Sequence, residues 1–188
     1  MLKHIQEHCA SVIIAGIRNV SIEKPEQLLK ELRCRNETDL SVQFLNAGLI
    51  ATWEHLYFAV LDSLTAFGTN RNISKNLSVE IMLYASAQRQ IKKAIRLLGV
   101  SHDCADIAVV VVGKATQDIE VVMVSLLKRL GKDVDDSVLD LSPRKMRNIC
   151  KAFAITETEF EVVAEHGDRK QGLVDIIIER MALLATRV

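Results

Sequence analysis

A group of cationic side chains at helical spacing is the pattern in this sequence that best suits binding chemistry. The group follows the segment 84–88 and consists of Arg89, Lys92, Lys93 and Arg96, with Ile91, Ala94, Ile95 and Leu98 expected on the opposite face. At 100° per residue the cations cover about a third of a helix circumference. A cation in the first helical turn opposes the helix dipole, so Arg89 is disfavoured there until an anion binds. The pattern predicts a site for a phosphate or a nucleic-acid end. A cationic face that only contacts solvent is the alternative.

A phosphate-binding loop is a second candidate, because the pair Gly113-Lys114 follows an apolar run. Such a loop needs a glycine five residues before this pair, where the chain has Ala108. It also needs serine or threonine directly after the lysine, where the chain has Ala115. We therefore interpret this segment as the plain end of a strand.

Metal and thiol chemistry have little support. His4, His8 and Cys9 would form a metal site only if the first residues were helical and another ligand came from elsewhere, and a frayed terminus is the interpretation we favour. Cys104 stands near His102 in an expected turn, without the geometry of a nucleophile and its base. The four cysteines are scattered, which argues against a zinc site or a disulfide framework and favours reduced thiols in a cytoplasmic protein. Nothing in the sequence demands an enzyme, a cofactor or a metal.

Length and composition predict one globular domain spanning residues 1–188. About half of the residues are apolar, which is enough for a sizeable core. The 24 lysines and arginines balance 24 acidic residues, yet residues 71–102 carry six lysines and arginines against one glutamate. A local basic face on a neutral body therefore fits better than a globally basic nucleic-acid binder. We expect no membrane helix and no signal peptide, since the sequence lacks apolar runs of the required kind.

The apolar patterns predict an alternation of strands and helices. Strands are expected at 12–17, 42–46, 79–84 and 107–112, the last of them inside the sheet. Helices are expected over 24–34, 52–67, 87–98, 118–130, 142–152 and 173–185, with a short one beginning at 156. Residues 68–76 are expected to form a polar loop. The pattern favours a single α/β (α+β) domain with a mixed central sheet covered by helices.

Four segments of the chain resemble one protein family in order and spacing. They are Glu54–Val60, Arg71–Glu80, Leu83–Ile95 and, as the closing helix, Ile178–Leu184. The family is the small KEOPS complex subunit known as Cgi or PRPK-binding protein (TPRKB). The similarity is strongest over residues 53–100 and extends over nearly the whole chain. One departure is Ala87, where the family often has glycine; we expect alanine to restrict the turn slightly but to suit a first helical position.

The resemblance implies a non-catalytic accessory subunit of the complex that makes threonylcarbamoyladenosine (t6A) next to the tRNA anticodon. Such a subunit binds the small atypical kinase-ATPase subunit directly, and that subunit in turn contacts the sugar-kinase-like catalytic subunit. It also helps to capture tRNA through the single-stranded 3′ CCA tail. A cationic helix start suits such a flexible nucleic-acid end better than it suits a duplex. We therefore expect a cytoplasmic protein with no cofactor and no membrane partner.

The residues expected to hold the tRNA tail surround the cationic helix start. They are Leu56, Lys75, Ser86, Arg89, Gln90, Ile91, Lys92 and Lys93. The cations would meet phosphates, and backbone N–H groups after Ser86 would hold one of them. Gln90 would hydrogen-bond a base edge or a ribose, and Leu56 and Ile91 would line an apolar slot for the terminal base.

The kinase contact is expected on the closing helix, whose apolar residues spread over more than one face. The residues that we favour are Ile176, Ile177, Arg180 and Leu184. The alternative function is a pure protein-interaction regulator of the kinase with no direct RNA binding. In that case the basic helix face would meet an acidic patch of a protein partner.

Overall fold

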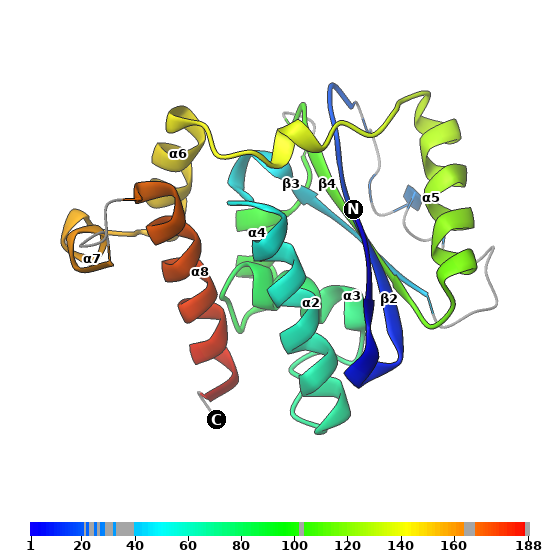
Figure 1. Ribbon diagram of the computed structural model, residues 1–188, viewed down its shortest axis with the longest axis horizontal. Coiled ribbons are helices and arrows are strands. Elements are labelled where there is room, and N and C mark those ends of the chain that lie inside the picture. The colour runs from blue at the N-terminus through cyan, green and yellow to red at the C-terminus, as the bar shows by residue number, and fades with distance from the viewer. Residues whose placement is uncertain are drawn as a thin grey trace.

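A computed structural model of the chain shows a four-stranded sheet with helices on both of its faces (Figure 1). The structure describes residues 1–20, 22, 25, 27–28, 32, 40–101, 104–163 and 168–186, with the side chains of 162, 163, 185 and 186 not included. Of the helices labelled in Figure 1, one stands alone on one face of the sheet and the rest gather on the other. No helix among the described residues is both long and apolar enough to span a bilayer.

The sheet is antiparallel throughout. Its strands are, in spatial order, β1 (Leu2–Ile5), β2 (Ala10–Ile17), β4 (Ile107–Gly113) and β3 (Ser41–Asn46). The expected α+β class is confirmed, and so is the position of β4 inside the sheet. The expected mixed sheet is wrong, because every neighbouring pair of strands runs antiparallel. The expected fraying of the N-terminus is wrong as well, since β1 pairs with β2.

The sheet separates two apolar cores because successive side chains of a strand point to opposite faces. In β4 the alternate residues 108, 110 and 112 face one core, and 107, 109 and 111 face the other. A strand that is buried on both faces has no polar alternation, which is why its sequence is a continuous apolar run.

Four of the described helices supply most of the helical side chains of the larger core. They are α2 (Trp53–Gly68), α3 (Leu77–Ala85), α6 (Pro143–Phe153) and α8 (Arg169–Thr186). Helix α5 (Thr116–Leu130) packs on β2 and β4 over the smaller core. It ends at Gly131, whose φ of 61° is the left-handed conformation that terminates many helices.

Several shorter elements lie between these helices and strands. Helix α4 (Ile91–Leu98) packs on α3, and α7 (Glu157–Val163) packs on α8. The described residues also form the 3₁₀ turns η1 (Gln6–His8), η2 (Ala47–Leu49) and η3 (Asp136–Leu139). Thr156 and Glu159 bond each other's backbone N–H groups at the start of α7. This reciprocal capping box explains why a short helix begins there.

The prediction of a strand at 79–84 is wrong, because this segment lies in α3. The helix starts where Asn76 Oδ1 accepts a hydrogen bond from the backbone N–H of Ser78 at 3.0 Å. Residues 80–85 are all buried, so the segment lacks the polar face by which an amphipathic helix is recognised. A short apolar run cannot be assigned to strand or helix from its periodicity alone.

The other predicted elements in the described residues are confirmed, with ends that differ by a few residues. The largest differences are at α4, which begins at Ile91 instead of 87, and at α8, which begins at Arg169 instead of 173. The predicted helix over 24–34 lies mostly outside the described residues.

Candidate nucleic-acid interface

The turn between α3 and α4 is closed by its own backbone hydrogen bonds. The N–H of Ala87 donates to the carbonyl oxygen of Tyr84 at 2.8 Å, and the N–H of Gln88 donates to that of Leu83 at 3.0 Å. The two bonds form a Schellman motif, which satisfies carbonyl groups at a helix C-terminus. The expectation that N–H groups after Ser86 hold a phosphate is therefore wrong for these two groups, because each already has an acceptor.

Ala87 occupies the left-handed position of this motif. Its φ is 49°, a conformation in which the Cβ of an L-residue is strained and glycine is not. This strain gives a physical reason for the glycine that the resembled family often has at this position. It also corrects the expectation that Ala87 opens a helix, since α4 begins at Ile91 with Gln90 as its N-cap.

Arg89 contacts the far end of α8. Its Nη1 donates a hydrogen bond to the carbonyl oxygen of Leu184 at 3.3 Å, in a partly buried position. Carbonyl groups in the last turn of a helix lack intrahelical partners and form the negative end of the helix dipole. The dipole of α8 therefore stabilises Arg89, and the guanidinium of this exposed residue already has a partner on α8.

Helix α4 exposes cations and isoleucines on one surface. The cations are Lys92, Lys93 and Arg96. Of the four apolar residues expected opposite the cations, Ala94 and Leu98 are buried, whereas Ile91 and Ile95 are 44% and 50% exposed. Among the described residues, none of these three cations forms an ion pair with a carboxylate. The helix thus offers positive charge that has no carboxylate partner in the described part of the chain, beside apolar surface.

The remaining residues expected at this site are not all brought together. Lys75 lies before α3 and Arg89 lies after it, so this nine-residue helix separates them by about 14 Å along its axis. Gln90 is exposed, and its side chain makes no capping bond. Leu56 and Ser86 are completely buried, so their expected contacts with a nucleotide are wrong.

A buried carboxylate holds the loop that carries Lys75. Glu80 is completely buried, and its two carboxylate oxygens accept the N–H groups of Ile73 and Ser74 at 2.9 and 2.6 Å. Sequence reasoning missed this role because it placed Glu80 in a strand. The signal that could have revealed it is Asn76, a good N-cap residue directly before an apolar run.

His55 joins the start of α2 to the end of α3, and sequence reasoning missed it as well. Its Nδ1 accepts the N–H of Ala51 at 3.2 Å, and its Nε2 donates to the carbonyl oxygen of Ala85 at 2.7 Å. These partners assign the proton of the neutral ring to Nε2. Complete burial lowers the pKa of His55 to about 4, so the ring is neutral at pH 7. His55 thereby fixes the residue that directly precedes the turn.

A hollow of about 680 Å³ opens beside this turn, between residues 86–88 and the helices α7 and α8. Its charged residues are Glu159, Glu179 and Arg180. The guanidinium of Arg180 donates to a Glu159 carboxylate oxygen at 2.6 Å, and so is already paired. Two carboxylates and one paired cation do not attract phosphate, so any phosphate contact belongs on the outer face of α4.

The residues expected to contact a kinase lie mostly inside the protein. Ile176, Ile177 and Leu184 are buried in the core that α8 shares with α2 and α3. Arg180 is partly exposed, and it also donates to the carbonyl oxygen of Phe153. Ile177 therefore has no surface to offer a partner in this conformation, and Ile176 and Leu184 offer only the small area by which they line the hollow beside the turn.

Within the described part of the chain, no three His, Cys, Asp or Glu side chains are grouped so that they could hold a metal. His4 Nδ1 lies 3.1 Å from Ser11 Oγ, and His8 Nε2 lies 3.2 Å from Thr65 Oγ1. Each histidine thus has its own hydrogen-bond partner in a different part of the fold.

Comparison with known proteins assigns the chain to a family. The family model described as "Kinase binding protein CGI-121" matches residues 17–185. The chain belongs to the CGI-121 family. The resemblance inferred from the motifs is therefore confirmed.

Two relatives of this family carry functional names. A "Regulatory protein Cgi121" of Methanocaldococcus jannaschii is 31% identical over 116 residues, which cover 62% of this chain and 72% of the relative. An "EKC/KEOPS complex subunit CGI121" of Coccidioides immitis is 24% identical over 153 residues, which cover 77% of this chain and 72% of the relative.

Proposed function

We propose that this chain is a non-catalytic accessory subunit of the KEOPS complex, which makes threonylcarbamoyladenosine in tRNA. In this role it binds the small atypical kinase-ATPase subunit and helps to recruit tRNA through the 3′ CCA tail. The kinase-binding description of its family and the KEOPS name of one relative support the first part of the proposal. The outer face of α4 supports the second part.

One observation on α4 carries the RNA proposal. Its exposed cations have no carboxylate partner among the described residues, and they lie beside the exposed Ile91 and Ile95. Proteins that bind single-stranded nucleic acid combine positive charge along the backbone with apolar surface for the bases. A core helix would bury its isoleucines, so their exposure favours contact with a ligand. Lys92, Lys93 and Arg96 would meet phosphates, and Gln90 and Ile91 would meet the terminal nucleotides.

The experiment is a binding titration of the isolated chain with full-length tRNA and with tRNA that lacks the CCA tail. We expect weaker binding without the tail, and equal affinity would remove the tail-capture claim. The double variant Lys92→Glu/Lys93→Glu should lower affinity for intact tRNA by tenfold or more and reduce the salt dependence. The matched control is Lys128→Glu/Lys132→Glu at the end of α5, on the other face of the sheet, which should leave binding unchanged.

A pure protein-interaction regulator is the second candidate, and the turn before α4 favours it. The N–H groups of Ala87 and Gln88 have backbone acceptors, and Arg89 is bonded to Leu184. The turn thus offers no ready phosphate cradle. Absence of tRNA binding by the isolated chain, with kinase binding retained, would select this candidate.

A further inference from the structure

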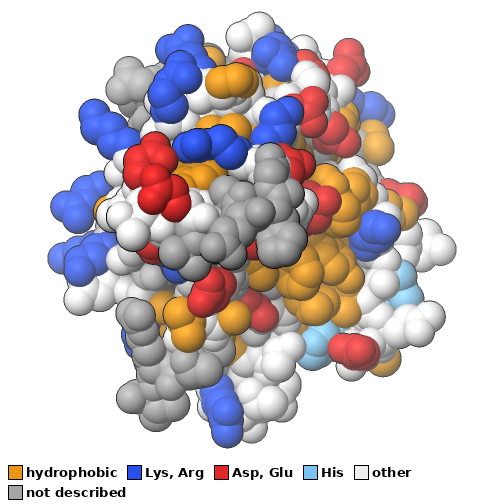
Figure 2. Space-filling view, turned by 60° about the vertical axis from the view of Figure 1, so that its left-hand side comes forward, with side chains coloured by type: hydrophobic (Ala, Val, Ile, Leu, Met, Phe, Trp, Pro, Cys, Tyr) orange, Lys and Arg blue, Asp and Glu red, His pale blue; other side chains and the backbone are white. Residues whose placement is uncertain are grey.

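Helix α2 presents a partly exposed aromatic face to solvent. This aromatic face consists of Trp53, Tyr57, Phe58 and Leu61, and the opposite side of the helix supplies His55, Leu56, Ala59, Val60, Ser63 and Ala66 to the core. The ring centroids of Trp53 and Tyr57 are 5.9 Å apart, as are those of Tyr57 and Phe58. Phe58 is 37% exposed. In Figure 2 the hydrophobic side chains to the right of the centre form a continuous patch, with acidic and histidine side chains at its border.

The number of aromatic residues on this face is high for this chain. The sequence contains eight residues of the types Phe, Tyr and Trp, and three of them lie here, including the single tryptophan. A monomer gains more from burying such rings than from leaving them half exposed. Tryptophan and tyrosine are also the residues that most often dominate the binding energy of protein interfaces. The aromatic face therefore has the composition of an interface centre.

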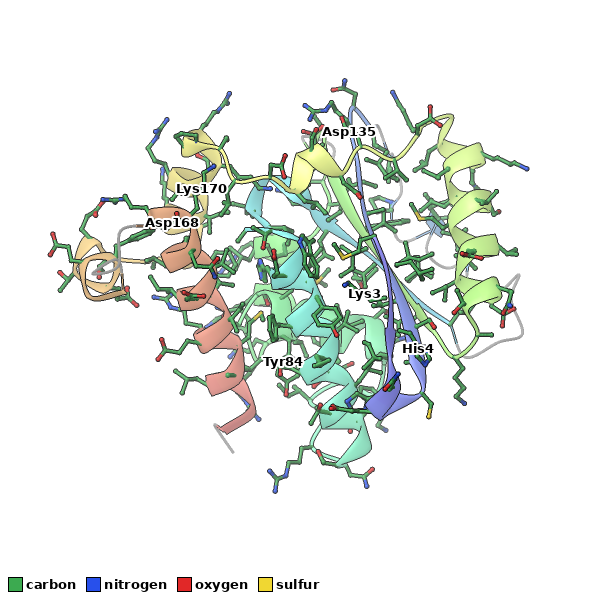
Figure 3. All side chains as sticks on the ribbon, in the orientation of Figure 1. Lys3, His4, Tyr84, Asp135, Asp168 and Lys170 are labelled. Atoms are coloured by element: carbon green, nitrogen blue, oxygen red, sulfur yellow. The ribbon has the colours of Figure 1, made fainter. Side chains whose placement is uncertain are left out.

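An acidic hollow continues the aromatic face at the start of α2. It measures about 500 Å³ and includes both Trp53 and Glu54 in its lining. Its other carboxylates are those of Asp136, Asp140 and Asp168, and its cations are Lys170 and the amino group of Met1. Figure 3 shows Asp168 and Lys170 at the start of α8. Four carboxylates against two cations leave the hollow negative, which suits a basic side chain of a partner.

Two further charged residues border the aromatic face. Lys3 Nζ lies 5.7 Å from the ring centroid of Trp53, and Figure 3 shows this residue on β1 beside α2. This cation–π contact contributes to the stability of the ring's position at the surface. Asp62 lies one turn after Phe58, and partial burial raises the pKa of its carboxyl group to about 6. No ion pair of Asp62 is found among the described residues, so a partner cation would relieve the cost of its burial.

The aromatic face is separate from the basic face of α4. Helix α2 packs against α3, and α3 packs against α4, so α3 lies between the two surfaces. Figure 1 shows α2 in front of α4. A ligand on one surface therefore leaves the other surface open.

We propose that the aromatic face and the acidic hollow together bind the kinase subunit, through a kinase segment that presents apolar side chains flanked by lysine or arginine. This inference rests on the proposed function, in which the partner is a kinase. It differs from the contact expected on the closing helix, whose favoured apolar residues Ile176, Ile177 and Leu184 are at most 4% exposed. The apolar segment would cover Tyr57 and Phe58, and the basic side chain would enter the hollow beside Glu54.

The first test compares charge insertion on two exposed apolar surfaces. Phe58→Glu is compared with Val124→Glu on α5, since Val124 is 50% exposed and lies on the other face of the sheet. Affinity for the purified KEOPS kinase-ATPase subunit of the same organism is measured by calorimetry, after circular dichroism has confirmed that both variants fold. We expect Phe58→Glu to lower the affinity about thirtyfold or more, as for an interface hot spot, and Val124→Glu to leave it unchanged. Normal binding by folded Phe58→Glu, or an equal loss in Val124→Glu, overturns the inference.

A second measurement needs no substitution. Trp53 is the single tryptophan, so incorporation of 5-fluorotryptophan gives one ¹⁹F resonance at the edge of the proposed contact. Titration with unlabelled kinase should shift or broaden this resonance until it saturates at one equivalent. A complex that forms without any change in the resonance overturns the inference.

The possible outcomes separate this inference from the proposed function. If the wild-type chain does not bind the kinase, the proposed function fails and the inference fails with it. If the wild-type chain and Phe58→Glu bind equally well, only the inference fails. If the free chain dimerises and Phe58→Glu makes it monomeric without weakening the kinase complex, the aromatic face belongs to a second copy, and the inference is again wrong.

Discussion

The Nη1 of Arg89 and the carbonyl oxygen of Leu184 lie 3.3 Å apart, joined by a hydrogen bond between residues 95 positions apart in the sequence. The bond connects the turn before α4 to the last turn of α8. It places a cation at the negative end of a helix and gives a partner to a carbonyl group that the helix itself leaves without one. Arg89 therefore has a structural role that is independent of any bound RNA.

Arg89→Ala should lower the free energy of unfolding by about 1 kcal/mol, the usual net contribution of one hydrogen bond, because Arg89 is exposed and the bond is 3.3 Å long. Amide hydrogen exchange near Leu184 should accelerate, because the end of α8 loses its anchor. The control is Lys92→Ala on the exposed face of α4, which should change stability by no more than about 0.5 kcal/mol. Urea unfolding and exchange measurements check both effects, and equal stability of the two variants would contradict the role of the bond.

Ala87→Gly should stabilise the protein by about 0.5–1 kcal/mol. Glycine removes the strain of a φ of 49°, and this gain exceeds the entropy that glycine adds to the unfolded chain. Ala154→Gly should give a similar gain, because Ala154 ends α6 with a φ of 51°. Ala152→Gly, inside α6, is the opposite control and should cost about 1 kcal/mol. Urea midpoints at constant m-value measure all three, and a loss of stability in Ala87→Gly would refute the argument.

His55 should make the protein less stable as the pH falls from about 6.5 to 4. The folded-state pKa of about 4 is below the unfolded value near 6.5, so within this window the unfolded chain binds the proton and the folded chain does not. The contribution of His55 is complete above pH 6.5 and falls by about 3 kcal/mol at pH 4. Asp62 acts in the opposite direction, because its raised pKa of about 6 makes stability fall as the pH rises from 3.8 to 6.

The pH effect of His55 is isolated by comparing wild type with His55→Gln. Glutamine can still donate to the carbonyl oxygen of Ala85 but does not titrate in this range. The difference in unfolding free energy between the two proteins should therefore shrink as the pH falls from 7 to 4, whatever Asp62 does. A difference that is constant over this range would show that the ring of His55 is not held neutral.

Glu80→Gln should destabilise the protein by about 1–3 kcal/mol. The amide keeps one acceptor but points an NH₂ donor at one of the N–H groups of Ile73 and Ser74, which leaves a buried donor without a partner. Hydrogen exchange at these two amides should accelerate, and the loop that carries Lys75 should become more mobile. Glu120→Gln on the exposed face of α5 makes the same chemical change without this environment and should be neutral. Protection of Ile73 and Ser74 unchanged from wild type would disprove the anchoring role.

Much of the fold could be predicted because its strands and helices have clear boundaries. The run at 107–112 is apolar throughout, as expected for a strand buried on both faces, and Ser142-Pro143 has the composition of a helix start. The prediction of a strand at 79–84 was wrong because this segment, too, is largely apolar and buried. A buried helix without a polar face has the same composition as a buried strand, and only the N-cap Asn76 distinguishes them.

The candidate site was less predictable, because its properties depend on contacts between distant parts of the chain. The position of Ile91 and Ile95 on the exposed side of α4 follows from how this helix packs on α3. The bond from Arg89 to Leu184 and the burial of Ile177 depend on where α8 lies. No local pattern encodes these relationships, although the local spacing of the cations on α4 was sufficient to place them on a common exposed helix.

The order of strands also has a consequence for biosynthesis. β3 ends at Asn46, and among the described strands it pairs only with β4, which begins at Ile107. The ribosome must therefore have synthesised the chain beyond Gly113, and this part must have left the ribosome, before β3 can pair with β4. During this interval both β2 and β3 have an open edge, a state in which nascent chains associate with one another. The yield of folded protein should therefore depend on how fast the segment between β3 and β4 is translated. It should also depend on whether chaperones protect the open strand edges during that time.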